Sequence, residues 1–154
     1  MDIKELLTKQ TNEAFEGEMS LMGALQGLSQ EEASWRLNDT TWTIEEIIYH
    51  VAACKIEYCK QGFGKWDFEY SKTEGNIQAS LGLLNKAQEH LTECLSNCTL
   101  EDLDQPISTK FHGQSAAHFF WIMIMHDISH GAQIGMIRRA YGAYTDFRPV
   151  KGIS

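Results

Sequence analysis

The segment from Ser115 to Tyr141 constrains the fold more than any other part of this chain. It contains seven consecutive apolar residues, Phe119 to Met125, and no proline, and Gly142 follows it as a typical helix stop. This pattern predicts one long, unbroken helix. A helix that is apolar on all sides must be covered on all sides, so we expect this helix to be the most enclosed one of an all-α fold.

Three further helical patterns precede it. Apolar residues recurring about every 3.6 residues predict helices from about Asp2 to near Gly27, from Thr43 to near Gly62, and from about Asn76 to Asn97. The second begins with T-x-x-E, a capping box directly ahead of apolar residues. A short helical turn is expected at residues 29–35. We therefore predict an all-α four-helix bundle that forms a single domain over residues 1–154.

Two of the expected connections are long for a helical bundle. They cover residues 62–75, between the second and third helices, and residues 99–114, between the third and fourth. The first of them carries aromatic residues without helical periodicity. These side chains either anchor the loop on the bundle or form a lid over a pocket, and both interpretations stay open. The aromatic residues are Phe63, Trp66, Phe68 and Tyr70.

Composition and charge exclude several classes of partner. The chain has 154 residues, of which 43% are hydrophobic, and this suits one compact domain. Its formal net charge of −8 repels nucleic acid and anionic lipid alike. No stretch approaches the roughly 20 apolar residues of a membrane span, and the N-terminus lacks the basic start and apolar core of a signal peptide. We expect no nucleic-acid or membrane partner and a cytoplasmic location.

The four cysteines do not form a zinc-knuckle or redox motif. Neither Cys54 and Cys59 nor Cys94 and Cys98 have C-x-x-C spacing, so we expect buried, reduced thiols. His90, Cys94 and Cys98 follow one another at four-residue steps and share a helical stripe, which is an alternative position for a soft metal. Three successive turns of one straight helix span about 12 Å, however, so these side chains cannot all converge on one ion.

The histidines give a stronger indication of a metal site. His126 and His130 lie four residues apart in the last helix, so both project from one face and can bind one ion. Two ligands do not make a tight site, and a third must come from another helix. His50 is the best candidate, because it lies in the middle of the second helix near its core-facing stripe. His90, His112 and His118 are poorer candidates.

Three segments carry a resemblance to a known family. The sequence WTIEEIIYH, from Trp42 to His50, resembles the segment that leads into the first metal-binding histidine of the DinB/YfiT-like superfamily of small helical metalloproteins. HDISHGAQI, from His126 to Ile134, is similar to the closing motif of that superfamily, and RRAYG, from Arg138 to Gly142, matches its usual helix end. This superfamily is the damage-inducible helical family and not the DNA polymerase of the same name. The resemblance covers essentially the whole chain.

The resemblance implies a metal triad at His50, His126 and His130. Many relatives have a histidine and an arginine–glycine pair inside the last motif, where this chain has Ser129, Gly131 and Ala132, so the polarity of the pocket should differ. Three imidazoles leave at least one position of a divalent ion open for water or a thiol. Zinc or nickel suits such ligands best. Glu46 and Glu57 fall on roughly the same face as His50 and are candidates for a base or for orienting the ligand.

Two functional hypotheses follow from such a site. In the first, the protein is an enzyme that resembles the thiol-dependent transferases and isomerases of the superfamily, and a small thiol such as bacillithiol or glutathione attacks an electrophile. A metal-dependent hydrolase is a variant of this hypothesis. In the second, it is a non-catalytic, stress-associated metal-binding scaffold. The apolar character of the last helix and of the run from Met19 to Leu28 also predicts a homodimer.

Overall fold

The computed structural model describes residues 1–64, 69–107 and 114–142. Within these ranges the chain forms helices and no β-strand, so the all-α prediction is confirmed for the part of the chain described. An isolated antiparallel bridge joins Pro106 to Ser115. The helices are α1 (Ile3–Glu16), α2 (Leu21–Leu25), α3 (Gln30–Ser34), α4 (Ile44–Phe63), α5 (Ile77–Asn97), α6 (Leu100–Asp104) and α7 (Ala116–Tyr141).

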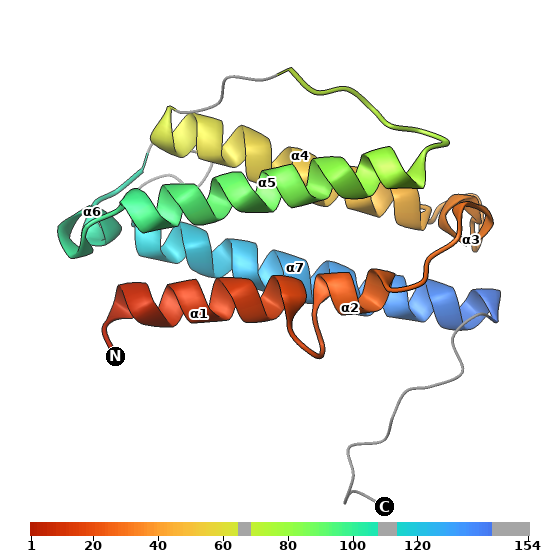
Figure 1. The fold of residues 1–154 in the computed structure, drawn as a ribbon, viewed down its shortest axis with the longest axis horizontal. Helices are drawn as coiled ribbons and strands as arrows, with labels where there is room; N and C mark the ends of the chain where they lie inside the picture. The colour runs from red at the N-terminus through yellow and green to blue at the C-terminus, as the bar shows by residue number, and fades with distance from the viewer. Residues whose placement is uncertain (65–68, 108–113, 143–154) are drawn as a thin grey trace, which may run out of the picture.

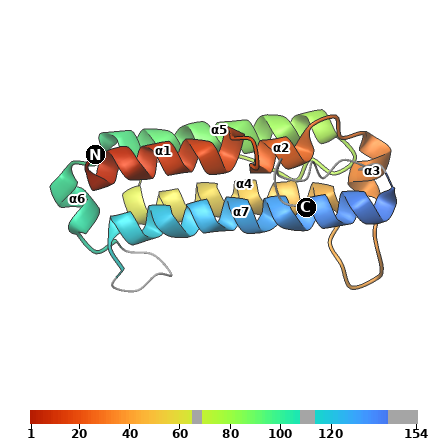
Figure 2. The ribbon, with the colours of Figure 1, turned by 90° about the horizontal axis from the view of Figure 1, so that it is seen from below.

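The long helices lie side by side along the long axis of the molecule. In Figure 1, α4 and α5 run in the same direction and pack closely on each other, while α1 and α7 run in the opposite direction. Figure 2 shows α2 continuing the line of α1, with both of them beside α7. Because α4 and α5 are neighbours with the same direction, the chain between them must return along the length of the molecule. This explains why that connection is long.

The ends of the helices are fixed by local capping groups. At α4 the side chains of Thr43 and Glu46 form the predicted capping box, and Gly64 ends the helix in the left-handed conformation, with φ of 66°. Ser115 accepts a hydrogen bond from the backbone amide of His118 at the start of α7, and Gly142 ends that helix with φ of 89°. These signals are local in sequence, so the predicted bounds of α4, α5 and α7 agree with the structure to within two residues.

The prediction of one continuous helix from Asp2 to Gly27 is wrong. Helix α1 ends at Glu16, where Gly17 turns into extended backbone, and Ser20 starts α2 by accepting a hydrogen bond from the amide of Gly23. The break brings the start of α2 against α7. Gly131 of α7 faces this turn, and a Cβ atom there would lie 3.4 Å from the Cα atom of Leu21, at the edge of ordinary van der Waals contact.

Two other expectations are corrected by the structure. The link at residues 99–114 contains a short helix, α6, which starts with a capping box of Thr99 and Asp102. Helix α7 is not covered on all sides, because part of its apolar surface faces solvent. Trp121 is 51% exposed, Met125 44% and Met136 68%, and Ile128 lies on the same outward stripe. The helix therefore has a buried face and an apolar outer face.

A buried ion pair crosses the interior of the fold. The ammonium group of Lys55 in α4 lies 2.7 Å from Asp127 Oδ2 in α7 and 2.5 Å from Gln88 Oε1 in α5, and it stands over the ring of Phe15 in α1. The side chains of Lys55 and Asp127 are only 0% and 1% exposed. This network connects four helices. It fixes the position of α7 relative to α4 next to His126, which directly precedes Asp127.

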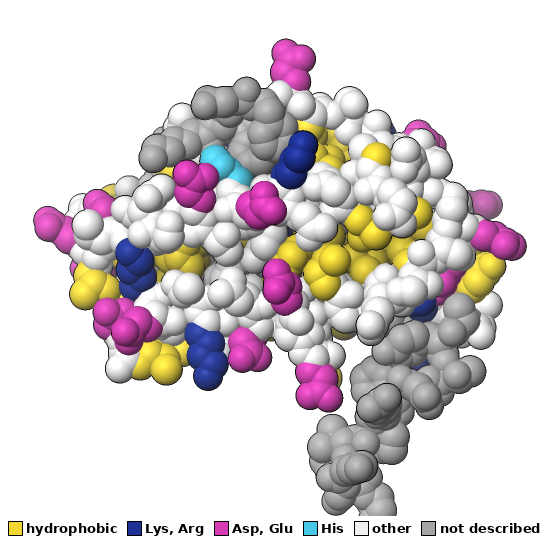
Figure 3. Space-filling view, in the orientation of Figure 1, with side chains coloured by type: hydrophobic (Ala, Val, Ile, Leu, Met, Phe, Trp, Pro, Cys, Tyr) yellow, Lys and Arg dark blue, Asp and Glu magenta, His cyan; other side chains and the backbone are white. Residues whose placement is uncertain are grey.

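The surface is mixed in character. On the face seen in Figure 3, acidic side chains are scattered, in keeping with the net charge of −8, and hydrophobic side chains reach the surface between α2 and α5. Across the part of the chain that the structure describes, none of the helices combines the length and apolar character needed to span a lipid bilayer.

Candidate metal centre

Helix α4 presents two possible metal ligands on one face. His50 and Cys54 are separated by four residues, so their side chains stand one turn apart on the helix. The Sγ atom of Cys54 lies 3.7 Å from both ring nitrogens of His50. Both side chains are half-buried. The prediction that all four cysteines are buried therefore holds for Cys59, Cys94 and Cys98 and is wrong for Cys54.

Helix α7 brings its two histidines to the same place. The Nε2 atom of His126 lies 3.2 Å from the Nε2 atom of His50. The ring of His130 lies beside both, with its centroid 5.0 Å from that of His50 and 4.5 Å from that of His126. The three histidines singled out in the sequence thus meet where α4 and α7 pack together.

His130 has an additional contact that orients its ring. Its Nδ1 atom lies 2.9 Å from the Oε1 atom of Gln133, one turn further along α7. An Nδ1–H group that donates to this amide oxygen leaves the lone pair on Nε2, the other ring nitrogen. Polar partners of this kind commonly fix the tautomer of a metal-binding histidine.

The electrostatic environment keeps two of the rings neutral. Burial lowers the pKa of His50 and of His126, and the charge of the neighbouring His130 lowers both further. For His126 the pKa falls to about 3. A neutral imidazole is the form that binds a metal ion, so near neutral pH these rings are ready to act as ligands.

The donor atoms fit a divalent transition metal. His50, Cys54 and His126 form a group in which one ligand atom from each lies within 4.8 Å of the others. Two nitrogens bound to tetrahedral zinc at about 2.0–2.1 Å are separated by about 3.3 Å, close to the spacing of the two Nε2 atoms. The same distance suits a hydrogen bond in which one ring donates to the other, and a cation bound by both rings would take the place of that proton. The residues present therefore suit a metal ion.

The two carboxylate candidates have other partners. Glu46 accepts hydrogen bonds from the backbone amide of Thr43 at 2.7 Å and from Arg36 at 2.8 Å. The bond to Arg36 and the backbone bond to Thr43 lower the pKa of this carboxyl group. Glu57 accepts a hydrogen bond of 2.8 Å from the hydroxyl group of Tyr70. Glu46 thus has a capping role, and Glu57 holds the segment before α5 against α4.

One aromatic side chain, Trp42, lies beside the histidine cluster, and others pack at the end of α4. The ring centroid of Trp42 lies 4.9 Å from that of His50, and this indole is 45% exposed, so it lies on the solvent side of the histidine. Phe63, the last residue of α4, packs edge-on against Phe119 and stacks on Phe120. Phe63 and Tyr70 are therefore anchored on the helices. The other two aromatic residues of the predicted connection at residues 62–75, Trp66 and Phe68, lie outside the described residues.

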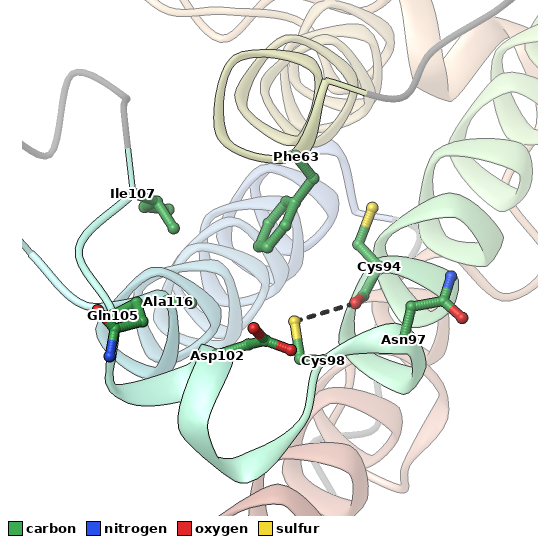
Figure 4. Close-up of a pocket in the computed structure, with 8 residues that line it drawn as sticks. All are labelled: Phe63, Cys94, Asn97, Cys98, Asp102, Gln105, Ile107 and Ala116. Atoms are coloured by element: carbon green, nitrogen blue, oxygen red, sulfur yellow. Dashed lines mark hydrogen bonds between the residues drawn. The ribbon is translucent and has the colours of Figure 1, made fainter.

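The alternative metal position on α5 does not form a compact cluster. Within the described chain, the Sγ atom of Cys94 lies 3.8 Å from His90 Nε2, but the thiol of Cys98 donates to the carbonyl oxygen of Cys94. Cys94 and Cys98 line a cavity of about 310 Å³ together with Phe63 and residues of α6 and α7. Figure 4 shows these side chains. His112, another histidine considered in the sequence, lies outside the described residues, and His118 is exposed near the start of α7.

Cys54 is the candidate ligand that sequence reasoning missed. The signal was present, since Cys54 follows His50 at the same four-residue spacing that separates His126 from His130.

The fold and the cluster define an all-helical protein with a group of histidine and cysteine side chains, suited to a metal ion, between two long helices. Comparison with protein families agrees with this description, since the model of the DinB superfamily matches residues 16–134. The chain belongs to the DinB superfamily. The matched region includes all four candidate ligands. Neither the curated proteins nor the solved structures contain a match to this chain.

Proposed function

We propose that this protein binds one divalent transition metal ion, zinc or nickel, through His50, His126 and His130. The single observation that carries the proposal is the pair of Nε2 atoms of His50 and His126, which face each other at 3.2 Å from different helices. The lowered pKa values of these two rings support it, because protons compete with the metal only in more acidic solution.

We propose further that the site acts on a thiol or on water. A divalent ion with an open position lowers the pKa of a bound water or thiol and so supplies a nucleophile. The candidate ligands are half-buried and Trp42 stands at their solvent side, which suits a small molecule that approaches from solution. The activity is then that of a thiol transferase with an electrophile as second substrate, or of a hydrolase.

A specific observation also favours the second hypothesis, a non-catalytic metal-binding scaffold. Cys54 lies close enough to His50 and His126 to complete a closed set of four protein ligands, as in structural zinc sites. In that case the ion ties α4 to α7. The two hypotheses differ in whether an external thiol can reach the metal.

The test starts from protein purified without a histidine tag. Elemental analysis should find one equivalent of zinc or nickel per chain. The loaded protein is then mixed with glutathione or bacillithiol and a chromogenic aryl halide, and product formation is followed by absorbance. Metal-dependent product that disappears in the His126→Ala variant supports the enzyme. A full equivalent of metal without thiol binding or product supports the scaffold, and no bound metal refutes both.

We also propose a four-helix bundle, formed by α1 with α2, α4, α5 and α7, that associates as a homodimer. The outward apolar stripe on α7 supports association, because exposed apolar side chains at i, i+4 and i+7 form a continuous face. These residues are Trp121, Met125 and Ile128. Light scattering should give twice the chain mass for the parent protein and a lower mass for the Met125→Glu variant. A monomeric parent at micromolar concentration contradicts this proposal.

A further inference from the structure

Cys54 has surroundings that distinguish it from the other cysteines. Its thiol stands beside the His50 ring on the solvent-accessible side of α4, and the neighbouring Tyr58 hydroxyl forms a hydrogen bond with it. Cys59, Cys94 and Cys98 lie in the apolar interior instead. Cys54 is also the cysteine in the group whose ligand atoms lie within 4.8 Å of one another.

The thiol of Cys54 lies within reach of an ion held by His50 and His126, since one ligand atom from each of the three residues lies within 4.8 Å of the others. With zinc–nitrogen bonds of about 2.0–2.1 Å and a zinc–sulfur bond of about 2.3 Å, tetrahedral angles place sulfur and nitrogen about 3.6 Å apart. The Sγ atom of Cys54 lies 3.7 Å from both ring nitrogens of His50, so its distance from Nε2 is in this range, and a rotation of the imidazole ring or of the thiol would aim both at one ion. On this basis we propose that the Cys54 thiolate is a ligand of the ion that His50 and His126 hold. This inference rests on the proposed metal site and adds a sulfur atom that the three-histidine set lacks.

A sulfur ligand changes which ions and which molecules the site accepts. Thiolate favours soft or borderline ions, so the site should prefer zinc over harder ions such as manganese. As a ligand, Cys54 would also take the coordination position on the ion that an external thiol substrate would use. If an external thiol took the place of Cys54 on the ion, the Cys54 sulfur would leave the ion and would accept the proton that the incoming thiol gives up. Cys54 thereby regulates access of a thiol substrate to the metal.

The experiment uses the full chain loaded with one equivalent of zinc or of cobalt. X-ray absorption at the zinc edge of the parent protein should show one sulfur neighbour at about 2.3 Å in addition to nitrogen neighbours. The cobalt form should show a sulfur-to-cobalt charge-transfer band in the near ultraviolet. The Cys54→Ala variant should lose this band, whereas the Cys98→Ser variant, a matched control outside the cluster, should keep it. Added glutathione should restore the band in Cys54→Ala at concentrations that leave the parent spectrum unchanged.

The outcomes separate this inference from the proposed function. If the parent binds one equivalent of metal with nitrogen and oxygen neighbours alone, Cys54 is not a ligand and the histidine site stands. A charge-transfer band that persists in Cys54→Ala without added thiol also overturns the role of Cys54. If the parent binds neither zinc nor cobalt, both proposals are overturned. Because the absorption measurement uses the parent chain, its result does not depend on the folding of any variant.

Discussion

The buried pair of Lys55 and Asp127 should be the most sensitive point of the fold. Replacing Lys55 by methionine keeps an apolar stem of similar length but removes the ammonium group that lies 2.7 Å from Asp127 Oδ2. The other carboxylate oxygen, Oδ1, has no hydrogen-bond partner within the described structure. The substitution therefore leaves a carboxylate that is 1% exposed without its countercharge.

Removing one partner of a buried ion pair costs about 3–5 kcal/mol, because the remaining charge loses both water and partner. For a chain of this size we expect the melting temperature to fall by roughly 6–20 °C. The assay is thermal and urea denaturation in the presence of a chelator, so that metal binding does not contribute to the free energy of unfolding. Lys60→Met, on the same helix but exposed, is the matched control and should change stability by less than about 0.5 kcal/mol.

A second variant separates a lost charge from lost packing. When Asp127 is also replaced, by leucine, no buried charge remains, and most of the lost stability should return. The reasoning is refuted if Lys55→Met unfolds within about 1 kcal/mol of the parent protein, or if the double variant is no more stable than the single one. Since Asp127 follows His126 directly, Lys55→Met should also weaken metal binding.

Two other predictions concern pH and a second buried ion pair. The pKa of His126 lies at about 3 in the folded protein against 6.5 for an unperturbed histidine, so the stability that this group contributes is fully present above pH 6.5. It should be lost as the pH falls towards 3, and urea denaturation of the metal-free protein at pH 7, 5 and 4 should show a steeper decline for the parent than for His126→Gln. Arg138 in α7 binds Glu32 at 2.5 Å and the carbonyl oxygens of Ala24 and Gln26 at 2.8 Å. Arg138→Ala should cost about 3 kcal/mol in urea denaturation, against at most about 1 kcal/mol for the exposed Arg139→Ala, and equal losses would contradict the assigned role.

The long helices could be predicted from the sequence because their signals are local. The capping box of Thr43 and Glu46 and the left-handed glycine after Tyr141 act within one turn of the helix end. The break between α1 and α2 also has local signals, Gly17 and the N-cap Ser20, but the apolar periodicity of the segment outweighed them in the prediction. The apolar spacing on both sides of Gly17 continues in register, so it gave no sign of the break.

Part of the candidate site could also be predicted from the sequence, because it depends on local spacing along one helix. The four-residue spacing of His126 and His130 places them on one face of a helix whatever the fold. The position of His50 near the core-facing stripe of the second helix, together with the resemblance, indicated it as the partner on another helix. The buried position of Lys55 could not be predicted, because lysine is almost always exposed unless it is paired. Its partners, Gln88 and Asp127, become neighbours only when three helices pack together.

The central claim is that α4 and α7 hold one metal ion between them, and equilibrium dialysis of zinc against three forms of the protein tests it most directly. The parent should bind one equivalent, His50→Ala should lose most of it, and His118→Ala, an exposed histidine of α7, should bind as the parent does. A chelator should lower the melting temperature of the parent and of His118→Ala and leave that of His50→Ala nearly unchanged, because the ion binds only the folded chain. If His50→Ala keeps a full equivalent of zinc and the chelator response of the parent, the ion does not lie between these helices.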